Sequence, residues 1–203
     1  MRTPHLFRPL AALLLVVGTA TASALPAAAK ERFDLDPRAT VLRWEGFSLR
    51  GSHEGTLHAT HGFLQYGAGM QLLGGEVVVP LASLVVTDIP ATDPIPCRRL
   101  RDHLLAEDFF WADRFPTARL VVTGATGQGV GRKRVTARLT MRGVTLPITF
   151  EATEQVRPNG QIEVRARIEL DRQRWGVRFR RSRDLLVRDV FTLDVLLVAT
   201  PRG

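Results

Sequence analysis

The chain has 203 residues, of which 45% are hydrophobic and 24% are charged. This length and composition suit one globular domain with its own core, and they exclude a disordered or fibrous protein. A single cysteine, Cys97, excludes an internal disulfide and a cysteine-based zinc site. The formal net charge is +8, and part of this excess lies at the N-terminus.

Residues 1–24 have the order of a secretory signal peptide. The first nine residues contain two arginines and no acid, and residues 10–18 form a short apolar run. Small residues follow and place a cleavage site after Ala24 or after Ala29. The alternative is a membrane anchor, but this run is too short to cross about 30 Å of hydrocarbon. We therefore expect a periplasmic or secreted protein, in which Cys97 is a spare thiol or a site for a mixed disulfide.

From residue 30 onward, apolar and polar residues alternate. The alternation is clearest at 135–142 and 161–170, and it predicts strands with one wet face, because successive side chains of a strand point to opposite faces. Weaker alternation predicts six more strands, at 40–48, 56–64, 74–82, 118–124, 147–155 and 190–199. We expect one all-β domain over residues 30–203, built as an antiparallel sandwich or barrel.

Residues 98–111 interrupt this alternation. Leucines at helical spacing predict a short helical segment, and it ends in three successive aromatic residues, Phe109, Phe110 and Trp111. Such a run outside a strand has to be buried. It would plug one end of a barrel or floor a pocket there.

The inward face of the expected barrel is uncharged and mixes large with small side chains. Its small members are Gly46, Ala137, Ala152 and Ala166. An eight-stranded barrel is either filled by its own side chains or holds one small ligand. In the second case the small residues keep a channel open, and the guest is a long apolar molecule held by buried area. In the first case they serve only to pack the interior.

Several short motifs resemble the YceI-like family. They include a His-Leu…Asp-Phe-Phe…Phe-Pro signature and a Leu-Thr-x-x-Gly-Val-Thr-x-Pro segment, in the order and spacing of that family. The matching residues are 44–46, 53–56, 103–110, 114–116, 139–147, 171–172 and 175–176. The resemblance covers about residues 33–200.

The resemblance implies a periplasmic, lipocalin-like, extended eight-stranded antiparallel β-barrel. Its members bind a polyisoprenoid, an isoprenoid quinone or a similar long-chain lipid in the lumen, which implies carriage rather than turnover and needs no other cofactor. A homodimer is compatible with such a family. The residues expected to line or close the lumen are Leu42, Trp44, Val79, Phe109, Phe110, Leu139, Phe150, Ile168, Trp175 and Phe191.

Six arginines and no acid lie between Arg172 and Arg183. They could form a basic rim for an anionic headgroup or for transient contact with a membrane surface. We favour the simpler interpretation of a solvated strand face and loop. For Arg172 we expect a structural ion pair with Asp102 or Asp108. We expect no nucleic-acid partner, since the segment lacks interleaved aromatic platforms.

Catalytic and metal sites have little support in the sequence. It contains no Gly-x-Ser-x-Gly, no Walker-type loop and no His-Glu-x-x-His motif, so we expect no enzyme. Asp102-His103 is the dyad that a hydrolase would use. His58 and His61 would face opposite sides of a strand, which disfavours a metal site shared with His53. The main alternative to lipid carriage is a filled barrel that acts as an envelope protein-interaction or stress-response module.

Overall fold

The computed structural model describes residues 30–48, 51–90, 92–179 and 187–202. The expected signal peptide, 1–24, and both cleavage positions lie outside the described residues. So do Arg180, Arg181 and Arg183 of the basic segment.

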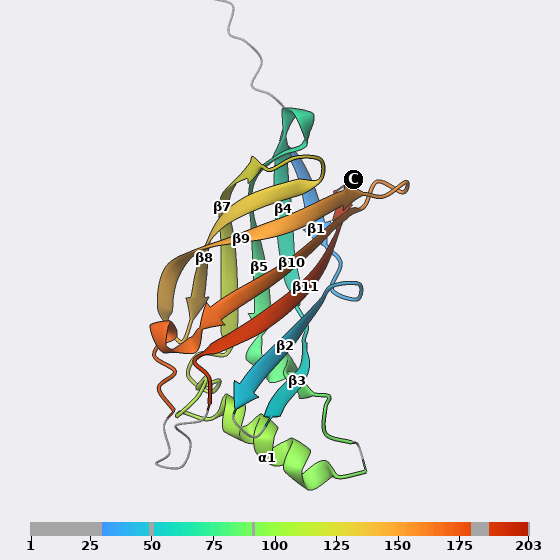
Figure 1. Cartoon of the computed structure of the whole chain (residues 1–203). Coiled ribbons are helices and arrows are strands. Elements are labelled where there is room, and N and C mark those ends of the chain that lie inside the picture. Colours follow the sequence, from blue (N-terminus) through green and yellow to red (C-terminus); the bar gives the residue numbers. More distant parts are fainter. Residues whose placement is uncertain (1–29, 49–50, 91, 180–186, 203) are drawn as a thin grey trace, which may run out of the picture.

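The described part of the chain consists of antiparallel strands, one α-helix and three short 3-10 turns (Figure 1). The strands are β1 (Glu31–Leu35), β2 (Val41–Ser48), β3 (Gly51–Leu57), β4 (His61–Gly67), β5 (Gln71–Pro80), β6 (Val85–Val86), β7 (Thr117–Gly127), β8 (Arg132–Met141), β9 (Val144–Val156), β10 (Ile162–Asp171) and β11 (Val190–Pro201). The helix is α1 (Pro94–Leu105), and the turns are η1 (Ala68–Met70), η2 (Leu81–Ser83) and η3 (Arg172–Trp175).

Eight of these strands close into a barrel. Their order is β1-β4-β5-β7-β8-β9-β10-β11, and β11 pairs back with β1. This confirms the expected eight-stranded antiparallel β-barrel. The order continues from β11 through β2 and β3 to β6, so these three strands extend the sheet beyond the ring. In Figure 1 this extension lies at the lower end of the barrel, beside α1.

A break between β1 and β2 lets both strands pair with β11. Residues 199–201 of β11 pair with β1, and residues 192–196 pair with β2. The fully buried Thr40 lies at the break, where its Oγ1 accepts a hydrogen bond from the backbone N–H of Val198 at 3.1 Å. The side chain thus replaces a backbone acceptor, which keeps a buried N–H group satisfied.

The structure differs from the expected elements in several places. Strands β1 and β6 were not among the expected strands. The single strand expected over 56–64 is wrong, because β3 ends at Leu57 and β4 begins only at His61. The sequence pattern does not reveal the turn between them, because the alternation continues through it. The helix begins earlier than expected, at Pro94, and 106–111 form turns instead of a helical end. Proline suits the first turn of a helix, where its missing N–H group has no intrahelical acceptor to lose.

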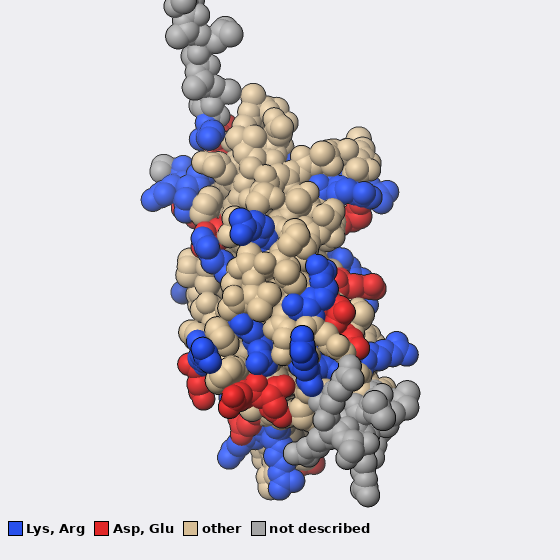
Figure 2. Space-filling model, turned by 90° about the vertical axis from the view of Figure 1, so that its left-hand side faces the viewer, with Lys and Arg blue, Asp and Glu red and all other residues tan. Residues whose placement is uncertain are grey.

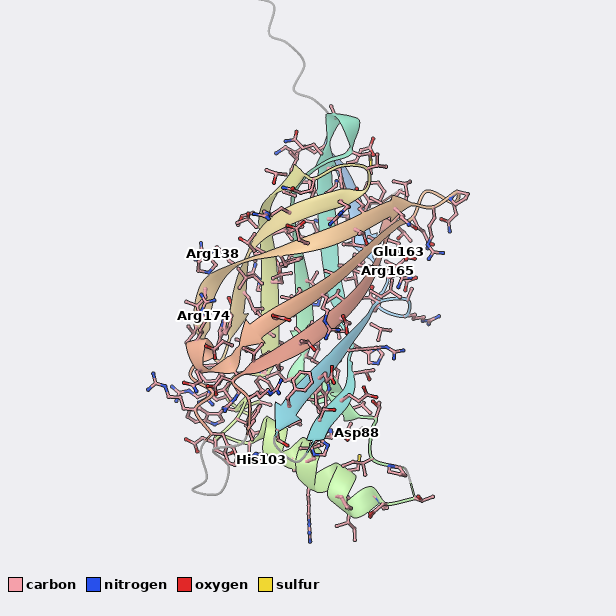
Figure 3. The ribbon with its side chains drawn as sticks, viewed as in Figure 1. Asp88, His103, Arg138, Glu163, Arg165 and Arg174 are labelled. Carbon is pink, nitrogen blue, oxygen red and sulfur yellow. The ribbon has the colours of Figure 1, made fainter. Side chains whose placement is uncertain are left out.

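The two faces of the barrel wall differ in chemistry as the alternation predicts. On β8, Val135, Ala137 and Leu139 are buried, whereas the side chains between them are exposed or partly exposed. Figure 3 shows Arg138 and Arg174 outside the barrel, and Figure 2 shows basic and acidic residues interspersed over one outer face. The outer face is therefore a mixed, solvated surface of the kind that surrounds an apolar interior.

The β2–β3–β6 extension depends on a glycine. A Cβ atom on Gly55 would lie 1.8 Å from the Val85 carbonyl oxygen and 2.7 Å from the indole ring of Trp44. We expect Gly55→Ala to lower the free energy of unfolding by about 1–3 kcal/mol, because the added atom overpacks backbone that cannot move aside. Urea denaturation followed by circular dichroism measures this.

The matched control is Gly46→Ala on β2, since a Cβ atom there meets nothing within 4 Å. It should change the free energy of unfolding by less than about 1 kcal/mol. Equal losses in both variants would show that the close approach at Gly55 is not what limits the side chain there.

Candidate functional site

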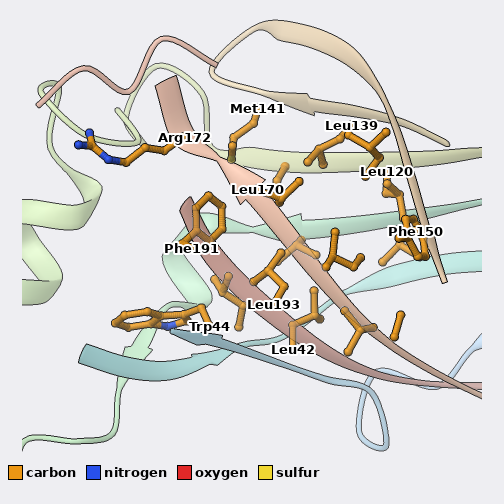
Figure 4. A pocket seen from close by; sticks show the side chains of 18 of the residues that line it. Leu42, Trp44, Leu120, Leu139, Met141, Phe150, Leu170, Arg172, Phe191 and Leu193 are labelled. Atoms are coloured by element: carbon orange, nitrogen blue, oxygen red, sulfur yellow. The ribbon is translucent and has the colours of Figure 1, made fainter. Parts of the chain in front are cut away.

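The barrel encloses an apolar cavity of about 280 Å³ (Figure 4). Its wall comes from inward positions of most barrel strands, with Leu and Val predominant. Binding sites for small molecules typically measure about 300–1,000 Å³, so the volume of this cavity lies just below that range. The interior is not completely filled by its own side chains, and the space suits a slim molecule.

Nine of the ten residues expected at the lumen do line this cavity. They are Leu42, Trp44, Val79, Phe109, Phe110, Leu139, Phe150, Ile168 and Phe191. Seven are on strands whose alternation indicated the inward face, and Figure 4 shows several of them around one space. Alternation therefore identifies the wall without any knowledge of how the strands are ordered.

Trp175 is the exception, since it does not line the cavity. It is fully buried in η3, and its Nε1 donates a hydrogen bond to the Leu139 carbonyl oxygen at 3.1 Å. The indole ring thus packs under β8 and anchors η3 there. Alternation gave no direction for this side chain because it lies outside any strand.

An aromatic cluster lies where α1 covers the barrel. Phe109 and Phe110 meet edge to face at 4.9 Å between ring centroids, and Phe110 lies 6.4 Å from Phe191. His103 of α1 contacts Phe179 at 4.4 Å between ring centroids. Together with leucines of α1, these rings line one end of the cavity. We call it the α1 end.

The α1 end also reaches the surface. His53, whose side chain is 50% exposed, and the exposed Arg188 both line the cavity there. His53 Nδ1 lies 2.7 Å from Asp88 Oδ2, which orients its ring. The cavity is therefore accessible to a ligand from this side.

The ion pair expected for Arg172 is wrong in its partner. Arg172 Nη2 lies 3.0 Å from Asp189 Oδ1, not beside Asp102 or Asp108. Its guanidinium also donates to the Val177 carbonyl oxygen at 2.9 Å, and it lies 5.8 Å from the centroid of the Phe109 ring. The side chain is only 4% exposed, and Figure 4 shows its guanidinium turned away from the apolar wall. Arg172 thus ties η3 to the start of β11, which is a structural role.

Two charged lining residues escaped the sequence analysis. Lys133 and Glu154 form an ion pair of 2.8 Å between Nζ and Oε1. Tyr66 donates its hydroxyl proton to Glu154 Oε2 at 2.5 Å. Burial, together with the Glu154 carboxylate, raises the pKa of Tyr66 far above its usual range. The signal was available, since Lys133 is two residues before Val135 and Glu154 two residues after Ala152 on the inward face.

The Asp102-His103 dyad does not assemble into a catalytic pair. Asp102 contacts Arg101 at 3.8 Å, and His103 Nδ1 lies 3.8 Å from Asp108 Oδ2. Within the described ranges, no three His, Cys, Asp or Glu side chains are grouped as metal ligands. The same part of the chain contains no helix with the length and apolarity needed to cross a membrane.

Comparison with known proteins agrees with this architecture. The model of the YceI-like domain matches residues 33–199. The chain belongs to the YceI-like family. Relatives of this YceI-like protein include a UPF0312 protein of Pseudomonas putida, 30% identical over 141 residues, which are 68% of this chain and 69% of the relative. A UPF0312 protein of Pseudomonas fluorescens is also 30% identical, over 142 residues and the same shares of both chains.

Solved structures share the fold of this YceI-like protein at low sequence identity. Burkholderia cenocepacia BcnA has a TM-score of 0.68 and 19% identity, over 82% of this chain and 99% of that one. A polyisoprenoid binding domain from Saccharophagus degradans has a TM-score of 0.60 and 16% identity, over 87% and 100%. Campylobacter jejuni YceI, as a mutant with a monobromobimane guest, has a TM-score of 0.56 and 14% identity, over 94% of each chain.

The contacts of Arg172 predict its contribution to stability. We expect Arg172→Met to lower the free energy of unfolding by about 2–4 kcal/mol, because buried carbonyl oxygens lose their donor. Arg178→Met, at an exposed position in the same basic segment, should change it by less than about 0.5 kcal/mol. Thermal denaturation measured by calorimetry compares the two. If both variants unfold like the wild type, Arg172 does not hold η3 in place.

Proposed function

We propose that this YceI-like protein binds a long apolar molecule in its barrel lumen and carries or sequesters it outside the cytoplasmic membrane. The ligand class is a polyisoprenoid, an isoprenoid quinone or a similar long-chain lipid. The observation that carries this proposal is the apolar cavity, open at one end and lined along its length by aliphatic and aromatic side chains. The Saccharophagus degradans domain, which shares this fold, is described as polyisoprenoid binding.

Burial of apolar area provides the binding energy. Each Å² of apolar surface removed from water contributes about 25 cal/mol, without any directional requirement. A cavity wall of this kind selects for the girth and length of a tail more than for particular polar groups. Catalysis is not required of such a site, and the Asp102-His103 pair offers no arrangement for it.

The filled barrel is the weaker alternative because the cavity is present. A role in contact with an anionic membrane surface is compatible with carriage, and Arg174 and Arg178 provide exposed positive charges near the α1 end. A periplasmic or secreted location and a homodimer belong to the same proposal. Cell fractionation and size-exclusion chromatography with light scattering test them separately.

The first experiment identifies the cargo. Protein purified from its own cell envelope is measured by native mass spectrometry, and the released molecules are extracted and identified. A prenyl or acyl species at stoichiometric occupancy is the expected result. Protein that carries nothing, and that also binds no added isoprenoid quinone or prenol, contradicts the proposal.

A substitution that fills the lumen should weaken binding. Ala166 lines the cavity from β10, where it is paired with Val195 and Ala152. In Ala166→Phe, loss of about 60 Å² of ligand contact at about 25 cal/mol per Å² corresponds to roughly tenfold weaker binding. Fluorescence titration with a prenol measures the change.

The control is Glu169→Phe, which adds the same ring at an exposed position of the same strand. It should leave the affinity of the prenol unchanged. Equal affinity of Ala166→Phe and the wild type would place the ligand outside the lumen.

A further inference from the structure

The end of the cavity opposite α1 is charged, although the wall that leads to it is apolar. Lys133 and Glu154 continue the inward positions of β8 and β9 and line the cavity there. Lys133 Nζ also donates a hydrogen bond to the Met70 carbonyl oxygen at 3.0 Å. Met70 belongs to η1, which Figure 1 shows at the end of the barrel far from α1. We call this the far end.

These charges are largely buried and are paired within the protein. The side chains of Lys133 and Glu154 are 16% and 9% exposed, and Tyr66 is fully buried. Glu154 accepts from Lys133 with one oxygen and from Tyr66 with the other. The ammonium group of Lys133 has both a carboxylate and a carbonyl oxygen as acceptors. Both carboxylate oxygens of Glu154 and two of the three ammonium protons of Lys133 are therefore engaged by the protein itself.

Packed side chains lie behind the pair. The rings of Phe33 and Tyr66 meet edge to face at 5.4 Å between centroids. Both residues are buried, and neither lines the cavity. The lumen thus ends at Lys133 and Glu154, and no packed apolar wall separates a ligand from them.

We infer that the Lys133–Glu154 pair is the stop for an apolar tail and sets the length of tail that the lumen accepts. This inference rests on the proposed function. A tail that advanced further would have to separate two buried charges, and its carbon atoms offer no hydrogen bond in return. A well-packed apolar floor would resist less, because side chains of that kind can shift to new rotamers.

The register of the strands gives the distance from the aromatic cluster to the stop. Val164 of β10 is opposite Glu154, and Leu170, toward the other end of β10, is opposite Phe191. The intervening length of strand is about 20 Å at about 3.3 Å per residue, and the tilt of barrel strands shortens it along the axis. Longer tails have to fold back or extend beyond the α1 end, so their affinity should stop rising.

The test is a chain-length series on the whole protein. Geraniol, farnesol, geranylgeraniol and solanesol compete with a bound fluorescent probe such as anilinonaphthalene sulfonate. For the wild type we expect affinity to rise along the series and then level off. The variant Tyr66→Phe/Lys133→Ala/Glu154→Ala removes the pair and leaves no orphaned hydroxyl. In this variant the affinity should level off only at the next longer prenol, which should bind several-fold more tightly than it binds the wild type.

Two further variants keep the test decisive. Tyr66→Phe/Lys133→Met/Glu154→Leu conserves the volume of the far end, so it should fold even if the alanine variant does not, and it should show a smaller shift in the same direction. The control is Arg134→Gln/Glu151→Gln, which removes an exposed ion pair of 3.0 Å from the outer face of the same two strands. It should reproduce the wild-type series.

The outcomes separate this inference from the proposed function. If the wild type binds prenols and every variant levels off at the same chain length, the pair is not the stop and only this inference fails. If the control shifts as much as the two far-end variants, the effect is one of strand stability and the inference fails as well. If the wild type binds no prenol of any length, the proposed function fails together with it.

Discussion

Closure of the sheet is the constraint on which the rest of this molecule depends. Once eight strands form a ring, every second side chain must point into one shared interior, and no strand edge within the ring remains to be covered. The ring closes where β11 meets β1. The alternation along β8, β9 and β10 then becomes a single apolar wall, since their inward side chains face a common axis. A cavity follows because alanines occupy several of these positions.

Different kinds of interaction form the two ends of the interior. At the α1 end, aromatic rings pack by contact alone, and neighbouring side chains such as His53 reach water. Contacts of that kind can rearrange at small cost. At the far end a buried ion pair joins β8 to β9 and, through Met70, to η1. The cavity is therefore a tube with an adaptable opening and a fixed bottom.

Much of this architecture follows from the order of apolar and polar residues, because alternation reports the face of a strand directly. It predicted an antiparallel sandwich or barrel and the inward positions of Leu42, Phe150 and Ile168, and the resemblance to the YceI-like family selected the barrel. It could not place Trp175, which lies in a 3-10 turn, or select Asp189 over Asp108 for Arg172, since that choice depends on how loops meet in space. Lys133 and Glu154 were missed for another reason. Lys133 precedes the strand expected at 135–142, and Glu154 was left out because the inward face was expected to be uncharged.

The pairing of β11 has a consequence for how the chain can fold. This strand follows every other element in the sequence, yet it is the neighbour of β1, β2 and β10. The hydrogen bond from Thr200 to the Asp34 carbonyl oxygen joins residues that are 166 positions apart. Contacts of such separation form slowly, because the loss of chain entropy on closing a long loop comes before any stabilisation from the contact. The ring therefore stays open until β11 has been added, and only then does the interior acquire all of its walls.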